Sequence, residues 1–198
     1  MTHNPYRSWC PICVEAKGKE DPHRQKRNKQ AEDSDDVPEF GMDYKTFGQE
    51  EEEDDKATMI VGRDRGTLQT FAHLCRCKGP GDEWVVDRLV EDIESLGHTK
   101  VIVKTDGEPA LVKVYESIKE KSSHPTLPKH PPAYDPQSNG AIEKVVDDVM
   151  GQIRALKIGM ESRLKRKVKS DENILQWMVE HAAMLINRCQ KGPRWENT

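Results

Sequence analysis

The chain has 198 residues, of which 34% are hydrophobic and 33% are charged, and its formal net charge is -4. This length allows one ordinary domain with appendages, and the high polarity indicates a modest core with charged segments attached to it. No apolar run reaches the length of a membrane span, and the N-terminus lacks the apolar centre of a signal peptide, so we expect an intracellular protein without a membrane partner.

The charges and cysteines are unevenly distributed. Residues 1–30 carry seven Lys or Arg against three acids, residues 31–56 carry twelve acids against two lysines, and residues 144–169 carry eight basic residues against three acids. These local zones bear more on binding partners than the net charge does. Five cysteines at irregular positions do not form a disulfide framework. Of these, Cys10 and Cys13 are candidate metal ligands.

The sequence of the N-terminal half indicates an aperiodic segment and a charged linker, followed by strands. Residues 1–25 lack periodicity, residues 26–39 form a charged linker, and residues 48–55 form a hydrophilic loop. Alternating or β-branched patterns predict three strands, at 40–47, 57–63 and 67–75. Asp64-Arg65-Gly66 predicts the hairpin turn between the last two, so these strands are expected to be antiparallel.

The C-terminal half predicts helices that alternate with short strands. Helical spacing of apolar residues predicts helices at 81–97, with Trp84 on its apolar side, at 109–121, from Ala141 onward, and at 172–189. The last helix is expected to bury Ile174, Trp177, Met178, His181 and Leu185. Short strands are expected at 101–103 and near 126–128, the latter within a segment, 122–140, that holds five prolines. This order predicts an α/β fold, a mixed sheet with helices covering it.

Three carboxylates occupy positions that suit a shared site. Asp43 lies within the first strand, Asp106 follows the strand at 101–103, and Glu143 lies in the first turn of the helix that begins at Ala141. The carboxyl ends of strands and the adjacent helix starts form the usual crevice of an open α/β sheet. Each residue alone has an ordinary explanation, as a turn residue, an exposed strand residue or a helix-start residue. Together they offer oxygen ligands for Mg²⁺ or Mn²⁺.

Several stretches carry a resemblance to a known family. They are PYRSWCPICVEAKG, VPEFGMDY, IVKTDGEPAL, PQSNGAIEKVV and WMVEHAAMLINR. In this order they resemble the integrase of LTR retrotransposons of the copia type and, more distantly, retroviral integrases. The family's Asp-Asp-Glu triad falls on Asp43, Asp106 and Glu143, and 36 residues separate the last two. The loop 134–140 resembles the family's active-site loop.

The resemblance implies an RNase H-like mixed five-stranded sheet flanked by helices. It divides the chain into a remnant of a zinc-binding domain at 1–25, a linker at 26–39 and a catalytic core at 40–198. It also implies two Mg²⁺ or Mn²⁺ ions held by the triad, 3′-end processing, and strand transfer of element DNA into target DNA. DNA as the partner, a homo-oligomeric state and a nuclear location are implied as well.

The resemblance also bears on the N-terminal cysteines. The gap of two residues between Cys10 and Cys13 lets both thiolates bind one Zn²⁺. They match the cysteine half of the family's His-His-Cys-Cys domain. His3 is the candidate histidine ligand and His23 is a possible substitute. We expect residues 1–36 to be loosely attached to the core.

Phosphate contacts should dominate DNA binding by such a core. The residues expected to bind DNA are Gln137, Asn139, Lys144, Arg154, Lys157, Arg163, Lys165, Arg166, Lys167 and Lys169. The helix departs from retroviral relatives after Glu143, because Asp147 and Met150 stand where those relatives carry basic residues. Asp147 would repel a phosphate unless it joins the metal site. Two alternatives therefore stay open: an inactive nucleic-acid-binding fragment, and an RNase H-type nuclease that acts on RNA–DNA hybrids.

Overall fold

A computed structural model describes residues 2–18, 37–48, 56–129 and 140–189. Its centre is a five-stranded sheet with the order β3-β2-β1-β4-β5. The strands are β1 (Glu39–Phe47), β2 (Ala57–Asp64), β3 (Thr70–Cys75), β4 (Val101–Lys104) and β5 (Thr126–Lys129). β2 pairs antiparallel with both β1 and β3, whereas β4 runs parallel to β1 and β5 runs parallel to β4. The predicted mixed sheet of five strands is confirmed.

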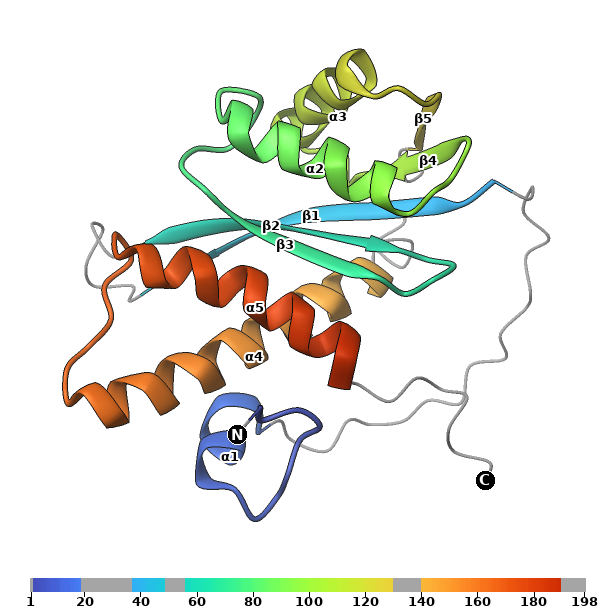
Figure 1. Cartoon of the computed structure of the whole chain (residues 1–198). Coiled ribbons are helices and arrows are strands. Elements are labelled where there is room, and N and C mark those ends of the chain that lie inside the picture. Colours follow the sequence, from blue (N-terminus) through green and yellow to red (C-terminus); the bar gives the residue numbers. More distant parts are fainter. Residues whose placement is uncertain (1, 19–36, 49–55, 130–139, 190–198) are drawn as a thin grey trace, which may run out of the picture.

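Helices cover both faces of this sheet (Figure 1). One face carries α2 (Glu83–Ser95) and α3 (Pro109–Lys121), and the other carries α4 (Gly140–Leu164) and α5 (Asn173–Cys189). Each face has its own apolar cluster, one built with α2 and α3 and the other with α4 and α5. No helix among the described residues is long and apolar enough to cross a membrane.

Alternation along β1 sends its side chains to the two clusters. Phe40, Met42 and Tyr44 are buried against α2 and α3. Asp43 and Gly41 therefore face the opposite side, toward α4. The cluster on that side is built by β2, β3, α4 and α5. β1 adds the partly buried Phe47 to it, and presents the Asp43 carboxylate on the same side.

The prediction for the buried face of the last helix was partly wrong. Met178 and Leu185 are buried as expected, together with Leu175, Val179, Ala182 and Ile186. Trp177 is instead 49% exposed and its ring stacks on His181, with ring centroids 4.3 Å apart. The buried stripe through Leu175, Val179 and Ala182 is shifted by one residue from the predicted one, which leaves Trp177 on the outer side of the helix. Trp84 on α2 is also substantially exposed.

The hairpin between β2 and β3 is longer than expected. β3 begins at Thr70 rather than at residue 67, and β2 includes Asp64. The Asp64 carboxylate is fully buried and accepts hydrogen bonds from the backbone N–H and the hydroxyl of Thr67, at 2.6 and 2.8 Å. His98 Nε2 lies 3.1 Å from its other oxygen. The loop is thus closed by a buried carboxylate, a tertiary effect that local turn propensity does not reveal.

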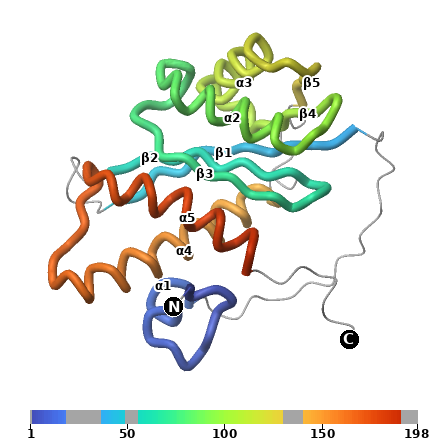
Figure 2. Tube along the Cα trace, viewed as in Figure 1, coloured from blue at the N-terminus to red at the C-terminus, as the bar shows by residue number. Residues whose placement is uncertain are grey.

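The N-terminal segment corrects two expectations. Residues Pro11–Lys17 form a short helix, α1, where no periodicity was recognised. Residues 2–18 are also packed against α4 rather than loosely attached, as the trace in Figure 2 shows. Cys13 and Ala16 of α1 are buried, and Asn4 Nδ2 donates a hydrogen bond to the carbonyl of Leu185 on α5 at 3.3 Å. The predicted linker at 26–39 lies mostly outside the described residues, and Glu39 already belongs to β1.

Candidate active site and metal centre

The end of β4 brings two aspartates to the same level of the sheet. In the parallel register Gly41 stands opposite Lys104, the last residue of β4, and Asp43 lies two residues further along β1. Asp106 follows β4 by two residues, so it reaches the part of β1 that β4 no longer covers. Asp106 Oδ1 accepts the backbone N–H of Glu108 at 2.8 Å, and Gly107 between them has a φ of 87°. This tight turn, which a glycine makes possible, fixes the direction of the Asp106 carboxylate.

Glu143 approaches the same place from α4. It lies in the first turn of the helix and is exposed. The preceding residue, Ile142, packs over β1, where a Cβ added at Gly41 would lie 3.8 Å from the Ile142 side chain. The start of α4 therefore lies next to the strand that bears Asp43.

The charges of these groups act on Asp43. Burial and then the negative charge of Asp106 raise the pKa of Asp43 from 3.8 to about 6, and Glu108 and Glu143 add to this effect. The backbone N–H of Tyr44, 2.7 Å from Asp43 Oδ1, opposes it. The negative charges that act on Asp43 form a negative centre, and a hard cation bound there would relieve it. The donor set thus fits Mg²⁺ or Mn²⁺.

The spacing of the carboxylates is looser than that of a closed metal site. Among the described residues, the group whose possible ligand atoms all lie within 4.8 Å of one another is His3, Cys10 and Cys13. Asp43, Asp106 and Glu143 are not drawn together that closely.

Sequence reasoning missed a lysine that pairs with Glu108, the acid two residues after Asp106. Lys78 Nζ lies 2.9 Å from Glu108 Oε1 and 5.2 Å from the ring centroid of Tyr44. The Tyr44 hydroxyl accepts the backbone N–H of Gly79 at 2.9 Å, which holds this loop against β1. Tyr44 and Glu108 also donate the backbone hydrogen bonds to the two aspartates. The position of Glu108, two residues after Asp106, is the only one of these signals visible in the sequence.

The second cluster is built by the N-terminal segment. His3 Nδ1 lies 3.6 Å from Cys10 Sγ and 3.6 Å from Cys13 Sγ, and all three residues are buried. Burial, followed by the positive charges of the N-terminus, Lys17, Arg7 and Arg163, lowers the pKa of His3 and favours a neutral imidazole. Backbone N–H groups of Cys13 and Ile12 lower the pKa of Cys10 and favour its thiolate. Neutral imidazole and thiolate are the ligand forms that Zn²⁺ binds, so these residues fit zinc.

Three of the expected ligands and contacts fall outside the described residues. They are His23, Gln137 and Asn139. The described basic residues are spread along the whole of α4 and beyond it. Lys144 is exposed beside Glu143, and Arg154 is exposed about 16 Å further along the helix axis.

The basic cluster 163–169 is about 30 Å along α4 from Glu143, so it does not share the carboxylate crevice. Arg166 forms a bidentate ion pair with Glu172, at 2.6 and 2.8 Å. Lys167 and Lys157 both contact Glu161. These pairs fasten the connection between α4 and α5, and Arg163 and Lys165 are exposed at the same end.

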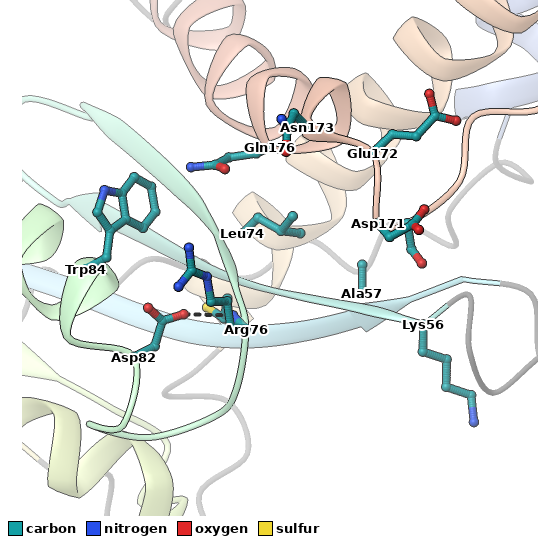
Figure 3. A pocket seen from close by; sticks show the side chains of 12 residues that line it. Lys56, Ala57, Leu74, Arg76, Asp82, Trp84, Asp171, Glu172, Asn173 and Gln176 are labelled. Carbon is teal, nitrogen blue, oxygen red and sulfur yellow. Dashed lines mark hydrogen bonds between the residues drawn. The ribbon is translucent and has the colours of Figure 1, made fainter.

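A separate hollow of about 330 Å³ lies between the beginnings of α2 and α5 (Figure 3). Trp84 and Arg76 line one side and Gln176 lines the other. The Arg76 backbone N–H donates to Asp82 at 2.7 Å. None of the three site carboxylates lines this hollow.

Comparison with solved structures decides the fold. No protein-family model and no curated protein matches the sequence. The catalytic core of BIV integrase matches with a TM-score of 0.50 and 14% identity, over 78% of this chain and 86% of that one. The HTLV-2 integrase catalytic core in complex with magnesium matches with a TM-score of 0.52 and 12% identity, over 79% and 89%. This chain has the fold of a retroviral integrase catalytic core.

A third integrase-fold match includes the N-terminal segment. It is an intasome of simian T-cell lymphotropic virus, with a TM-score of 0.58 and 16% identity. The match covers 96% of this chain but only 61% of that one. Within this fold, Asp43 lies on β1, Asp106 follows β4, and Glu143 lies at the start of α4.

Proposed function

We propose that this chain is the catalytic part of a retrotransposon integrase, a polynucleotidyl transferase that joins element DNA ends to target DNA. The observation that carries the proposal is electrostatic. In an integrase-type core, the charges of Asp106 and Glu143 both act on Asp43, at the place where β1 runs past the end of β4. Such a convergence of acids costs stability and is relieved by divalent cations.

The carboxylates and the nearby lysines have separate roles in the proposed reaction. Asp43, Asp106 and Glu143 hold two Mg²⁺ or Mn²⁺ ions, which supply Lewis acidity for in-line displacement at a phosphodiester when bound. A DNA 3′-hydroxyl forms the new P–O bond while the bond to the target 3′-oxygen breaks. Lys78, which pairs with Glu108, and Lys144, which follows Glu143, contact phosphates of the DNA. For this role we propose that the protein forms a homo-oligomer and acts on DNA in the nucleus.

The proposed metal dependence leads to a direct assay. Purified full-length chain is incubated with a short DNA duplex that carries an element end, in Mn²⁺ or Mg²⁺, and strand-transfer products are resolved by size. Glu143→Gln should abolish the products while the melting temperature stays within about 2 °C of wild type, because Glu143 is exposed. Glu116→Gln, a change of the same kind at an exposed position on α3, is the matched control.

One observation favours a second candidate, a nucleic-acid-binding core without catalysis. Asp147 is exposed one turn after Glu143 on the same side of α4, where it repels phosphate. If wild type binds the duplex but yields no product with either metal, this second candidate replaces the first. Cleavage of an RNA–DNA hybrid in place of strand transfer would instead identify an RNase H-type nuclease.

A further inference from the structure

A buried glutamine on α4 joins the N-terminal metal-ligand cluster to the core. Gln152 is fully buried, its Oε1 accepts a hydrogen bond from Lys17 Nζ, and its Nε2 donates to the carbonyl of Thr2 at 2.6 Å. Lys17 Nζ also donates to the carbonyl of His3 at 2.8 Å. A single side chain of the catalytic helix therefore contacts both ends of the segment that supplies the histidine and cysteine ligands.

Small residues on α4 make this close approach possible. Gly151, Ala155 and Gly159 are spaced four residues apart and lie on one side of the helix. A Cβ at Gly151 would lie 3.2 Å from Lys17 Cγ, and one at Gly159 would lie 3.8 Å from His3 Nε2 and from Ile12. Ala155 is fully buried. Gly151, Ala155 and Gly159 thus form a surface of small residues on α4, against which α1 and His3 pack closely.

The metal ligands belong to the same pieces of backbone that α4 holds. His3 supplies Nδ1 to the cluster and its carbonyl to Lys17, and Cys13 lies on α1 one turn before Lys17. His3 Nε2 faces α4 at Gly159, which leaves Nδ1 for a metal. Fixing His3 relative to Cys10 and Cys13 therefore also fixes the carbonyl and the ammonium group that Gln152 contacts.

We propose that a thiophilic divalent cation such as Zn²⁺, bound by His3, Cys10 and Cys13, braces α4 through Lys17 and Gln152. Metal occupancy then stabilises α4, the core helix that carries Glu143 in its first turn, although the metal ligands belong to the N-terminal segment. This inference depends on the metal cluster and not on catalysis, so it holds for an active integrase and for an inactive core alike.

The test uses the full chain with the carboxylate crevice left intact. Co²⁺ reports binding through its thiolate charge-transfer absorption, and Zn²⁺ is the ligand for hydrogen exchange followed by mass spectrometry. At free Zn²⁺ 100 times the Kd, the opening equilibrium of amides in residues 150–160 should fall about 100-fold if these openings are fully coupled to metal release. Cys13→Ser should lose both the absorption and this protection.

The decisive variant keeps the ligands and removes the connection. Lys17→Met retains the stem that packs on Gly151 and loses the ammonium group, so the Co²⁺ absorption should persist while protection of residues 150–160 falls at least tenfold. Gln152→Leu tests the other partner, and Gln176→Leu, on α5 and away from this contact, is the matched control. If Zn²⁺ protects only residues 2–18 in the wild type, or if Lys17→Met leaves the protection of α4 unchanged, the brace is refuted. Absence of Co²⁺ and Zn²⁺ binding refutes it equally.

Discussion

Asp106 stands beside Asp43 because β4 ends two residues before it, opposite Gly41, while β1 continues. The consequence is electrostatic: burial and the Asp106 charge raise the pKa of Asp43 to about 6. One face of β1 is apolar, with Phe40, Met42 and Tyr44. The other face carries the Asp43 carboxylate, whose ionised form is disfavoured in the folded protein. The charge on Asp43 should therefore lower the free energy of unfolding of the metal-free protein, and denaturation experiments can measure this loss.

Asp43→Asn should stabilise the metal-free protein at pH 7. Asp43 titrates near 3.8 when unfolded and near 6 when folded, so between these values the folded state holds more protons. The stability of the wild type therefore falls as pH rises through this window and stays reduced above it. Removing the charge should add about 1 to 2 kcal/mol to the free energy of unfolding at pH 7, after allowance for partial exposure.

Urea denaturation in EDTA at pH 4 and pH 7 measures this gain. The advantage of Asp43→Asn should be small at pH 4 and larger at pH 7, and Mg²⁺ at pH 7 should stabilise the wild type but not the variant. Asp171→Asn, at an exposed position in the connection before α5, is the control. A variant less stable than wild type at both pH values would show Asp43 to be a structural aspartate.

Asp147→Asn should strengthen DNA binding without loss of chemistry. Asp147 is exposed one turn beyond Glu143, where its charge opposes the phosphates that Lys144 attracts. We expect the Kd for a short duplex at low salt to fall about two- to fivefold, with the difference diminishing as salt is raised. Fluorescence anisotropy gives the affinity. Loss of strand transfer in this variant would place Asp147 among the metal ligands instead.

Lys78→Met should weaken the productive binding of DNA. Lys78 is held between Glu108 and the Tyr44 ring, and it is 42% exposed, so its ammonium group can reach a phosphate. We expect KM for the duplex to rise about threefold to tenfold with a smaller change in kcat, and Lys78→Arg to recover most of the loss. Lys119→Met, an exposed lysine on α3, controls for charge. An unchanged KM with lower kcat would mean that Lys78 acts only on the carboxylates.

The sequence sufficed for the elements whose signals are local. The alternation of β1, the amphipathic α2 and α3, and the proline at the start of α3 predicted bounds within a few residues of those observed. The fold class could therefore be predicted, together with the positions of Asp43 on β1, Asp106 after β4 and Glu143 at the start of α4. The predictions failed for long-range contacts. The attachment of residues 2–18 depends on Gln152, about 150 residues away in the sequence. The ion pair of Lys78 with Glu108 also joins distant residues. Neither leaves a periodic signal.

The α5 error has a similar origin. Helical spacing alone placed Trp177 and His181 in the core, but the same spacing fits a stripe through Leu175, Val179 and Ala182. Which stripe is buried depends on the space left by β3 and α4. For the cluster of His3, Cys10 and Cys13, the sequence predicted only the residue types. Their close approach depends on the packing of Lys17 and His3 against Gly151 and Gly159 of α4.

The tightest packing beneath the site provides the last prediction. A Cβ added at Gly62 on β2 would lie 2.3 Å from the ring of Phe40, which is fully buried between β1 and the helices α2 and α3. Gly62→Ala therefore forces the ring and β1 to move, and should lower the free energy of unfolding by about 1 to 3 kcal/mol. Gly41→Ala, the matched control on β1, meets Ile142 only at 3.8 Å and should change stability much less.

The two glycines also separate stability from the geometry of the carboxylates. Displacement of Phe40 shifts the strand that carries Asp43 three residues later, so Gly62→Ala should raise the Mg²⁺ concentration needed for half-maximal thermal stabilisation. Differential scanning fluorimetry across a Mg²⁺ titration measures both effects in one experiment. If Gly62→Ala melts at the same temperature as the wild type, the Phe40 ring can move aside at little cost and the predicted clash is wrong. If it melts lower with unchanged Mg²⁺ response, the position of Asp43 is set from the α4 side of β1 and not by the core beneath it.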